Sequence, residues 1–161
     1  MTRTANRLLL LILVVATIGC DRVTKHIAAS ALSEGPARSF LAGTLRLEYA
    51  ENTGAFLGLG ADWPPAVRTA VFAAGNAVLL AVLTALALRE RWPRVALLGM
   101  ALFVAGGASN LLDRITSGMV IDFMNVGVGP LRTGIFNVAD MAIMLGAGLL
   151  LFEGFRSHRR T

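Results

Sequence analysis

The chain has 161 residues, of which 55% are hydrophobic and only 16% are charged, and its mean hydropathy is +0.66. These values exclude an ordinary water-soluble domain, which carries more charge and interrupts its apolar runs more often. The formal net charge is +5, and the single cysteine excludes an internal disulfide.

Four apolar stretches predict helices that cross a membrane. We place these spans at about residues 8–32, 67–88, 95–113 and 135–154. The first has 13 uncharged residues, Leu8–Cys20, too few for a hydrocarbon core of ~30 Å, so it must continue through Asp21 to Leu32. The predicted fold class is therefore an all-α membrane core of four transmembrane helices. Because no internal repeat or linker is visible, we treat residues 1–161 as a single domain.

The start of the chain has a second interpretation. Arg3 and Arg7 precede an apolar stretch that ends at Cys20, the order found in the signal peptide of a bacterial lipoprotein. However, Thr17 stands three residues before the cysteine, where leucine is usual, and three further apolar stretches follow where a secreted domain would begin. We therefore favour a membrane-spanning helix over a cleaved leader.

Basic residues are distributed unevenly around the predicted spans. Eight of the fifteen lie on one side of the membrane, and these are Arg3, Arg7, Arg89, Arg91, Arg94, Arg156, Arg159 and Arg160. The others are interleaved with acidic residues. Under the positive-inside rule both termini are cytoplasmic and the segment 33–66 is extracytoplasmic. The positive charge thus reflects topology and contact with membrane lipids, and we expect no nucleic-acid partner.

The extracytoplasmic segment 33–66 is too long to be a simple turn. Within it Leu45, Leu47 and Tyr49 alternate with polar or small residues, which is the period of a strand with one apolar face. We predict a small β-sheet on the outer membrane surface, to which residues 121–126 add a strand.

Polar residues gather at the outer ends of the third and fourth predicted helices, where charge is expensive. Asn110, Asp113 and Arg114 are spaced to share one helix face, and Asp113 with Arg114 could form a structural ion pair within the membrane. Asn137 and Asp140 are likewise three residues apart, at a position where they could cap the fourth helix. The predicted topology brings all of these residues to one membrane surface.

Asp122 lies in the connection between those two helices and is the acid hardest to explain structurally. It stands among Val120, Ile121 and Phe123, away from any turn signal. Two carboxylates that approach closely in a poorly hydrated site share a proton. One can then take a proton from an attacking water while the other polarises a scissile carbonyl. Such a pair would suit hydrolysis of a peptide bond.

Other chemistries are less well supported by the sequence. Cys20 and His26 are six residues apart and do not share a helix face. His26 and His158 fall on opposite sides of the predicted membrane, so they cannot combine in a metal site or a triad. We expect no metal and no cofactor. Asp21 and Lys25, four residues apart, could be a surface ion pair without further role.

Several segments resemble the motifs of lipoprotein signal peptidase, or signal peptidase II. The matching segments are Asp21-Arg22-Val23-Thr24-Lys25, Asn52-Thr53-Gly54-Ala55-Phe56 and the blocks around Asp113-Arg114, Asp122-Phe123 and Asn137-Ala139-Asp140. That family comprises four-span aspartic proteases of the bacterial inner membrane that cut prolipoproteins just before the lipid-modified cysteine. The resemblance implies that Asp122 and Asp140 are the catalytic dyad, at the extracytoplasmic surface of the inner membrane.

The resemblance also implies a set of residues that orient the dyad and hold the substrate backbone. These supporting residues are Asp21, Lys25, Asn52, Gly54, Asn110, Asp113, Arg114 and Asn137. The implied partners are diacylglyceryl-modified prolipoproteins and membrane lipids, and we expect the protein to be a monomer. We further expect the substrate's signal helix to lie between the third and fourth spans, with residues 52–56 covering the site as a lid.

Three positions depart from the family pattern. Arg22 stands where glutamine is usual, Ser109 replaces the glycine before Asn110, and one alanine is missing before Phe56. None of these changes touches the two aspartates. A divergent paralogue with altered substrate or inhibitor sensitivity is compatible with this pattern.

Two other classes of protein also place acids within a membrane. A small transporter coupled to protons or other ions would use intramembrane aspartates as an ion path. Four spans without an inverted repeat, and acids clustered at the outer surface, argue against it. A non-catalytic scaffold is the third class. Replacing Asp122 by Asn separates the three, since a protease loses cleavage, a transporter loses flux and a scaffold loses little.

Overall fold

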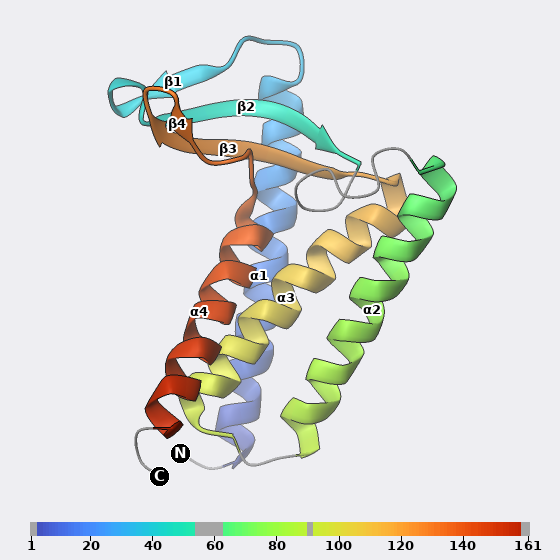
Figure 1. Ribbon diagram of the computed structural model, residues 1–161, viewed down its shortest axis with the longest axis vertical. Helices are drawn as coiled ribbons and strands as arrows, with labels where there is room; N and C mark the ends of the chain where they lie inside the picture. The colour runs from blue at the N-terminus through green and yellow to red at the C-terminus, as the bar shows by residue number, and fades with distance from the viewer. Residues whose placement is uncertain (1–2, 54–62, 90–91, 159–161) are drawn as a thin grey trace.

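The computed structural model describes residues 3–53, 63–89 and 92–158, which form four long helices and a small sheet (Figure 1). The helices run side by side, the sheet lies across one end of the bundle, and both chain termini lie at the other end. The helices are α1 (Arg3–Leu32), α2 (Pro65–Arg89), α3 (Arg94–Ser117) and α4 (Val138–His158).

Three helices are long and apolar enough to cross a membrane, over Ala70–Leu88 of α2, Arg94–Ser117 and Val138–His158. The protein is thus a multi-pass membrane protein with a mostly helical core. α1 has 30 residues, and in the described part of the chain it is not one of these three helices. Its apolar stretch ends at Cys20, and charged residues follow directly. The sequence prediction of four spans is therefore supported for three of them.

Two helix boundaries differ from the sequence prediction for local reasons. α3 continues to Ser117, and Gly118 ends it with a left-handed backbone (φ 74°) and an N–H that donates to the Arg114 carbonyl. α4 begins at Val138, not at Ile135, because Phe136 pairs with Met124 of the sheet.

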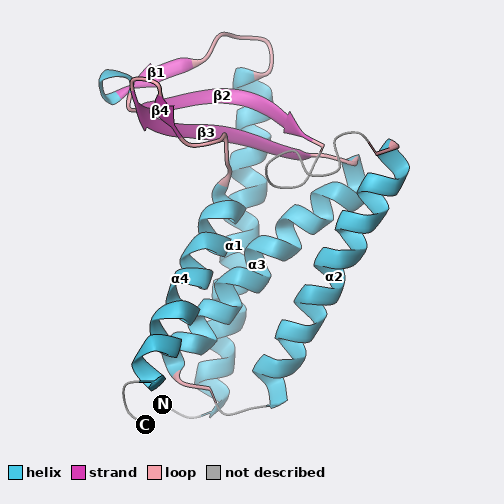
Figure 2. Cartoon of the chain, viewed as in Figure 1, coloured by secondary structure: helices cyan, strands magenta, loops and turns pink. Residues whose placement is uncertain are grey.

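The predicted sheet is present and is entirely antiparallel (Figure 2). Its strands follow the order β1 (Arg38–Phe40), β2 (Leu45–Asn52), β3 (Val120–Val128) and β4 (Leu131–Arg132). The predicted strand at residues 121–126 is the middle of β3, which pairs with β2. The register shifts between Leu47 and Ala50 of β2, after which Ala50 lies opposite Asp122. This bulge sets which residues of β2 flank the acid.

A small hydrophobic cluster fixes the sheet to the C-terminal end of α1. Ala28, Leu32 and Phe123 are buried together, and Leu47 and Tyr49 of β2 pack against them. Burial of these apolar side chains holds β3, and therefore Asp122, at a set height above the helices.

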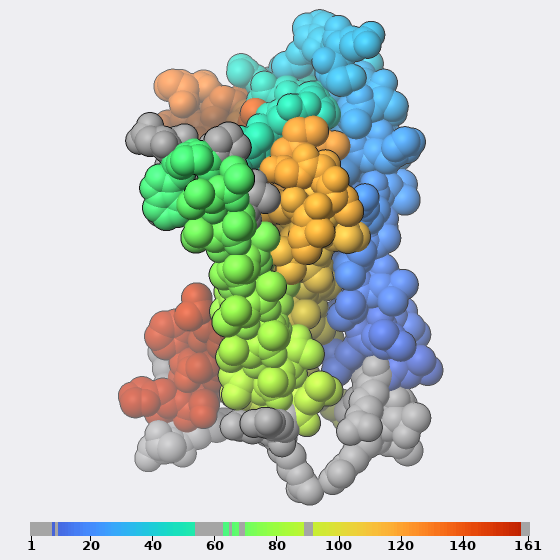
Figure 3. All heavy atoms as spheres, turned by 90° about the vertical axis from the view of Figure 1, so that its right-hand side faces the viewer, coloured from blue at the N-terminus to red at the C-terminus, as the bar shows by residue number. Residues whose placement is uncertain are grey.

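α3 and α4 are in backbone contact. A Cβ atom on Gly146 would lie 2.6 Å from the carbonyl oxygen of Gly99 and 2.7 Å from the backbone nitrogen of Phe103. Only glycine permits this approach, which is typical of small residues at membrane helix interfaces. α2 is different: it forms an edge of the bundle (Figure 3), and only 6% of its spanning window is buried.

Candidate active site

α1 supplies a buried acid and a buried base to the half of the bundle that lies nearest the sheet. Asp21 is 0% exposed and Lys25 is 3% exposed, so the surface ion pair considered from the sequence is wrong. One Asp21 oxygen accepts from the backbone N–H of Ala139 at 2.8 Å. The other accepts from the Ser109 hydroxyl and from Lys25 Nζ, each at 2.7 Å. Asp21 thus joins α1 to both α3 and α4.

The Lys25 ammonium has three acceptors, which is as many as it has N–H donors. Besides Asp21, these are Asn110 Oδ1 at 2.8 Å and Asp113 Oδ2 at 2.7 Å. The other oxygen of Asp113 accepts from the Arg22 guanidinium. Asp21, Lys25 and Asp113 are buried and Arg22 closes the cluster from its exposed side, so two acids and two bases balance one another.

Asn137 and Asp140 form a reciprocal cap at the start of α4. Asn137 Oδ1 accepts from the Asp140 backbone N–H at 2.9 Å, and Asp140 Oδ2 accepts from the Asn137 backbone N–H at 3.1 Å. This is a capping box with aspartate in its third helical position. The cap predicted as one alternative is present, and it fixes the Asp140 carboxylate in the site.

The remaining Asp140 oxygen faces α3. Asp140 Oδ1 accepts from Asn110 Nδ2 at 2.8 Å. Because Lys25 donates to Asn110 Oδ1, the amide has a defined orientation and must present its NH₂ group to the acid. Lys25 therefore acts on Asp140 through Asn110.

Asp122 is held by two amides from different elements. Asn52, in β2, donates from Nδ2 to Asp122 Oδ2 at 3.0 Å. Asn137, at the start of α4, donates from Nδ2 to Asp122 Oδ1 at 2.6 Å. Asn52 is a diagonal cross-strand neighbour, since it pairs with Val120. Asn137 therefore contacts both Asp122 and Asp140, which brings the two acids to one place.

The carboxyl of Asp122 is 3% exposed, and its pKa is raised to about 6. Burial is the main cause, and the nearby negative charge of Asp140 adds to it, while Asn52, Asn137 and Lys25 act in the opposite direction. Arg114, which donates to the Asn110 carbonyl at 3.2 Å, interacts electrostatically with both acids. A carboxyl with this pKa can hold or release a proton near neutral pH.

The structure brings together nine of the ten site residues expected from the sequence. They are Asp21, Lys25, Asn52, Asn110, Asp113, Arg114, Asp122, Asn137 and Asp140. Gly54 and Phe56 lie outside the described residues, and so does most of the expected lid at 52–56.

Two members of the network were known from the sequence only as departures from a pattern. Ser109 is fully buried against Asp21, and Arg22 pairs with Asp113. One available signal was that Ser109 lies four residues before Asp113 on the same helix face. The partners themselves are 88 and 91 residues away in the chain.

Comparison with known proteins gives consistent results. Residues 13–156 match the family model described as signal peptidase (SPase) II. The chain is 34% identical to the lipoprotein signal peptidase of Chlorobium phaeobacteroides, over 81% of this chain and 80% of that protein. It is 32% identical to that of Desulforapulum autotrophicum, over 94% of this chain and 93% of the relative.

A solved structure shares the fold. It is titled as a bacterial membrane enzyme determined by the in meso method at 2.3 Å resolution, and it aligns with a TM-score of 0.84 at 22% identity. The alignment covers 94% of this chain and 90% of that chain.

Proposed function

Because the chain belongs to the signal peptidase II family, we propose that it removes signal peptides from diacylglyceryl-modified prolipoproteins, cutting just before the lipidated cysteine. The observation that carries this proposal is that Asp122 and Asp140 both form hydrogen bonds with the same residue, Asn137. The family assignment does not favour the alternative of a transporter.

In the proposed mechanism Asp122 and Asp140 act as an aspartic dyad that holds one proton. The ionised carboxylate takes a proton from the attacking water, while the protonated carboxyl donates a hydrogen bond to the scissile carbonyl. As the tetrahedral intermediate collapses, the carboxyl that took a proton from water gives one to the leaving amine nitrogen, and the dyad again holds a single proton. The raised pKa of Asp122 supports this role, because a dyad must keep one proton at neutral pH.

The supporting residues have distinct parts in this mechanism. Asn52, Asn110 and Asn137 hold the acids by neutral amide donors, which leave the proton on the pair. Lys25 orients Asn110. Arg114 is near enough to both acids to stabilise negative charge that develops on the substrate.

We propose that α1 is the fourth span and that the protein is one domain of the bacterial inner membrane. Burial of Asp21 and Lys25 supports this topology, since their charges face the protein and not the lipid. Arg94 and Arg156 lie at the end of the bundle with the termini, away from the sheet. The positive-inside rule then makes that end cytoplasmic and the aspartate site extracytoplasmic.

The proposed substrate route differs from the one expected from the sequence. Gly99 and Gly146 let the backbones of α3 and α4 touch, so no space is left for a signal helix between those two helices. Within the described part of the chain, α2 packs substantially against α3 alone. We propose that the signal helix enters between α2 and α4 and lies over α3. We propose that the protein acts as a monomer.

A reconstituted assay tests this function. The purified protein and its Asp140→Asn variant are incubated with a diacylglyceryl-modified peptide, and mass spectrometry locates the cut. We expect cleavage directly before the modified cysteine by the wild type and none by the variant. Cleavage at another bond, or an active variant, would reject the proposal.

A further inference from the structure

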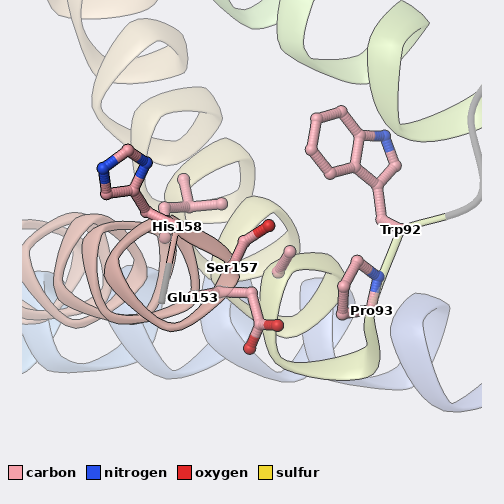
Figure 4. Close-up of a pocket in the computed structure, with 8 residues that line it drawn as sticks. Trp92, Pro93, Glu153, Ser157 and His158 are labelled. Carbon is pink, nitrogen blue, oxygen red and sulfur yellow. The ribbon is translucent and has the colours of Figure 1, made fainter. Parts of the chain in front are cut away.

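A cavity of about 440 Å³ lies at the end of the bundle opposite the aspartates. It opens between the segment that leads into α3 and the last two turns of α4, and its lining includes Trp92, Ala96, Leu150, Glu153 and Ser157. Figure 4 shows Glu153 and Ser157 projecting from α4 toward the side on which Trp92 and Pro93 lie. The proposed peptidase mechanism uses none of these residues.

Glu153 is the unusual residue in this cavity. Its Oε2 atom is buried and accepts no hydrogen bond from any of the residues that the structure describes. Arg156 Nη1 lies 3.7 Å from it, close enough for electrostatic attraction but too far for a hydrogen bond. Because a carboxylate that is short of donors is costly to bury, the Glu153 side chain, which lines the cavity, favours a ligand that carries N–H or O–H groups.

The surroundings restrict the class of ligand. Among residues 3–53, 63–89 and 92–158, no group of three histidine, cysteine, aspartate or glutamate side chains could hold a metal ion. A primary ammonium requires fewer protein ligands, and one carboxylate with a neighbouring hydroxyl suits it. Trp92, Ala96 and Leu150 offer an apolar wall beside these polar groups. A tryptophan at the end of a spanning helix is typical of the level of lipid headgroups.

We propose that this cavity binds the headgroup of a phospholipid with a primary ammonium, of the phosphatidylethanolamine type, from the leaflet opposite the aspartates. The ammonium donates to the Glu153 carboxylate, the Ser157 hydroxyl donates to the phosphate, and the glycerol and first methylenes contact Trp92 and Leu150. The quaternary ammonium of phosphatidylcholine has no N–H, so it cannot make the first of these hydrogen bonds.

Native mass spectrometry of the full-length protein tests this site with two lipids of identical chains. We expect dioleoylphosphatidylethanolamine to bind about tenfold more tightly than dioleoylphosphatidylcholine, as one charge-assisted hydrogen bond would give. Glu153→Gln should reduce this ratio to about one. The matched control Glu34→Gln, an exposed acid in the turn after α1 at the opposite end of the bundle, should retain it. Equal affinities in the wild type, or a ratio that persists in Glu153→Gln, would overturn the proposal.

A second variant fills the cavity without touching the acid. Gly154 lines the cavity, and a Cβ atom there would meet nothing within 4 Å, so Gly154→Leu should fold normally. We expect it to bind dioleoylphosphatidylethanolamine about tenfold more weakly, with an unchanged thermal unfolding midpoint. Wild-type binding by this variant would show that the lipid does not occupy the cavity. Lipid binding is measured without substrate, so an inactive Asp140→Asn protein should behave as the wild type.

Discussion

Four aspartates at the end of the bundle nearest the sheet form two pairs in very different surroundings. Asp21 and Asp113 accept hydrogen bonds from cations, namely Lys25 and Arg22. Asp122 and Asp140 accept hydrogen bonds from amides. Asp21 and Asp113 form ion pairs, whereas burial raises the pKa of Asp122, whose donors are neutral. The first pair therefore holds the helices together, and the second is suited to proton transfer.

The largest expected effect is on catalysis by the second pair. Asp122→Asn or Asp140→Asn should lower the rate of prolipopeptide cleavage by at least about a thousandfold, because an amide can neither accept nor release the proton. Single-turnover cleavage followed by mass spectrometry measures this loss. Thermal unfolding should show that both variants remain folded, and residual activity near the wild-type rate would contradict the assignment.

Removal of the shared base should damage the first pair. Lys25→Met removes the ammonium that pairs with Asp21 and leaves Asp113 paired with Arg22 alone. Both acids are buried, so water cannot readily replace the lost donor. We expect a loss of about 3–5 kcal/mol in the free energy of unfolding. Denaturant or thermal unfolding in micelles measures it, with the exposed Arg46→Gln as the control. A change as small as that of the control would mean that this cluster is not structural.

The raised pKa of Asp122 predicts how stability depends on pH. The folded protein binds this proton more tightly than the unfolded chain, so stability falls as the pH rises from about 4 to 6 and is then constant. The change from 3.8 to about 6 corresponds to about 3 kcal/mol. The free energy of unfolding is measured for the wild type and for Asp122→Asn across this range. The difference between the two free energies should decline as the pH rises. A constant difference would place the pKa of Asp122 at its ordinary value.

The smallest effect concerns the serine that supports Asp21. Ser109→Ala removes one hydrogen bond at 2.7 Å, but Asp21 keeps those from Lys25 and Ala139. We expect a loss of about 1 kcal/mol in stability and a cleavage rate within a few-fold of the wild type. Thr116→Ala, which removes an exposed hydroxyl bonded within its own helix, is the matched control. Identical unfolding midpoints for the two variants would show that Ser109 adds nothing.

The sequence predicted the elements of this fold better than their contacts. Apolar run lengths located the helices, and alternation in Leu45–Tyr49 located the central strand. The start of α4 was placed three residues early because the sequence could not show that Phe136 pairs with Met124. Local patterns report local structure, whereas that pairing depends on where the sheet is held.

For the candidate site, spacing identified residue types but not their partners. Four residues between Asp21 and Lys25 indicate an ion pair, yet the same spacing occurs on exposed and buried helix faces. Only the packing of α1 against α3 and α4 decides that both are buried. Arg22 likewise showed its departure from the family pattern, but not its pairing with Asp113.

The hydrogen bond from Ala139 to Asp21 joins residues 118 positions apart. During synthesis on a ribosome, α1 is therefore made long before the start of α4, which donates this hydrogen bond. The aspartates cannot reach their final geometry until nearly the whole chain has been inserted. A nascent chain without the last helix lacks Asp140, so it cannot yet bring the two aspartates together.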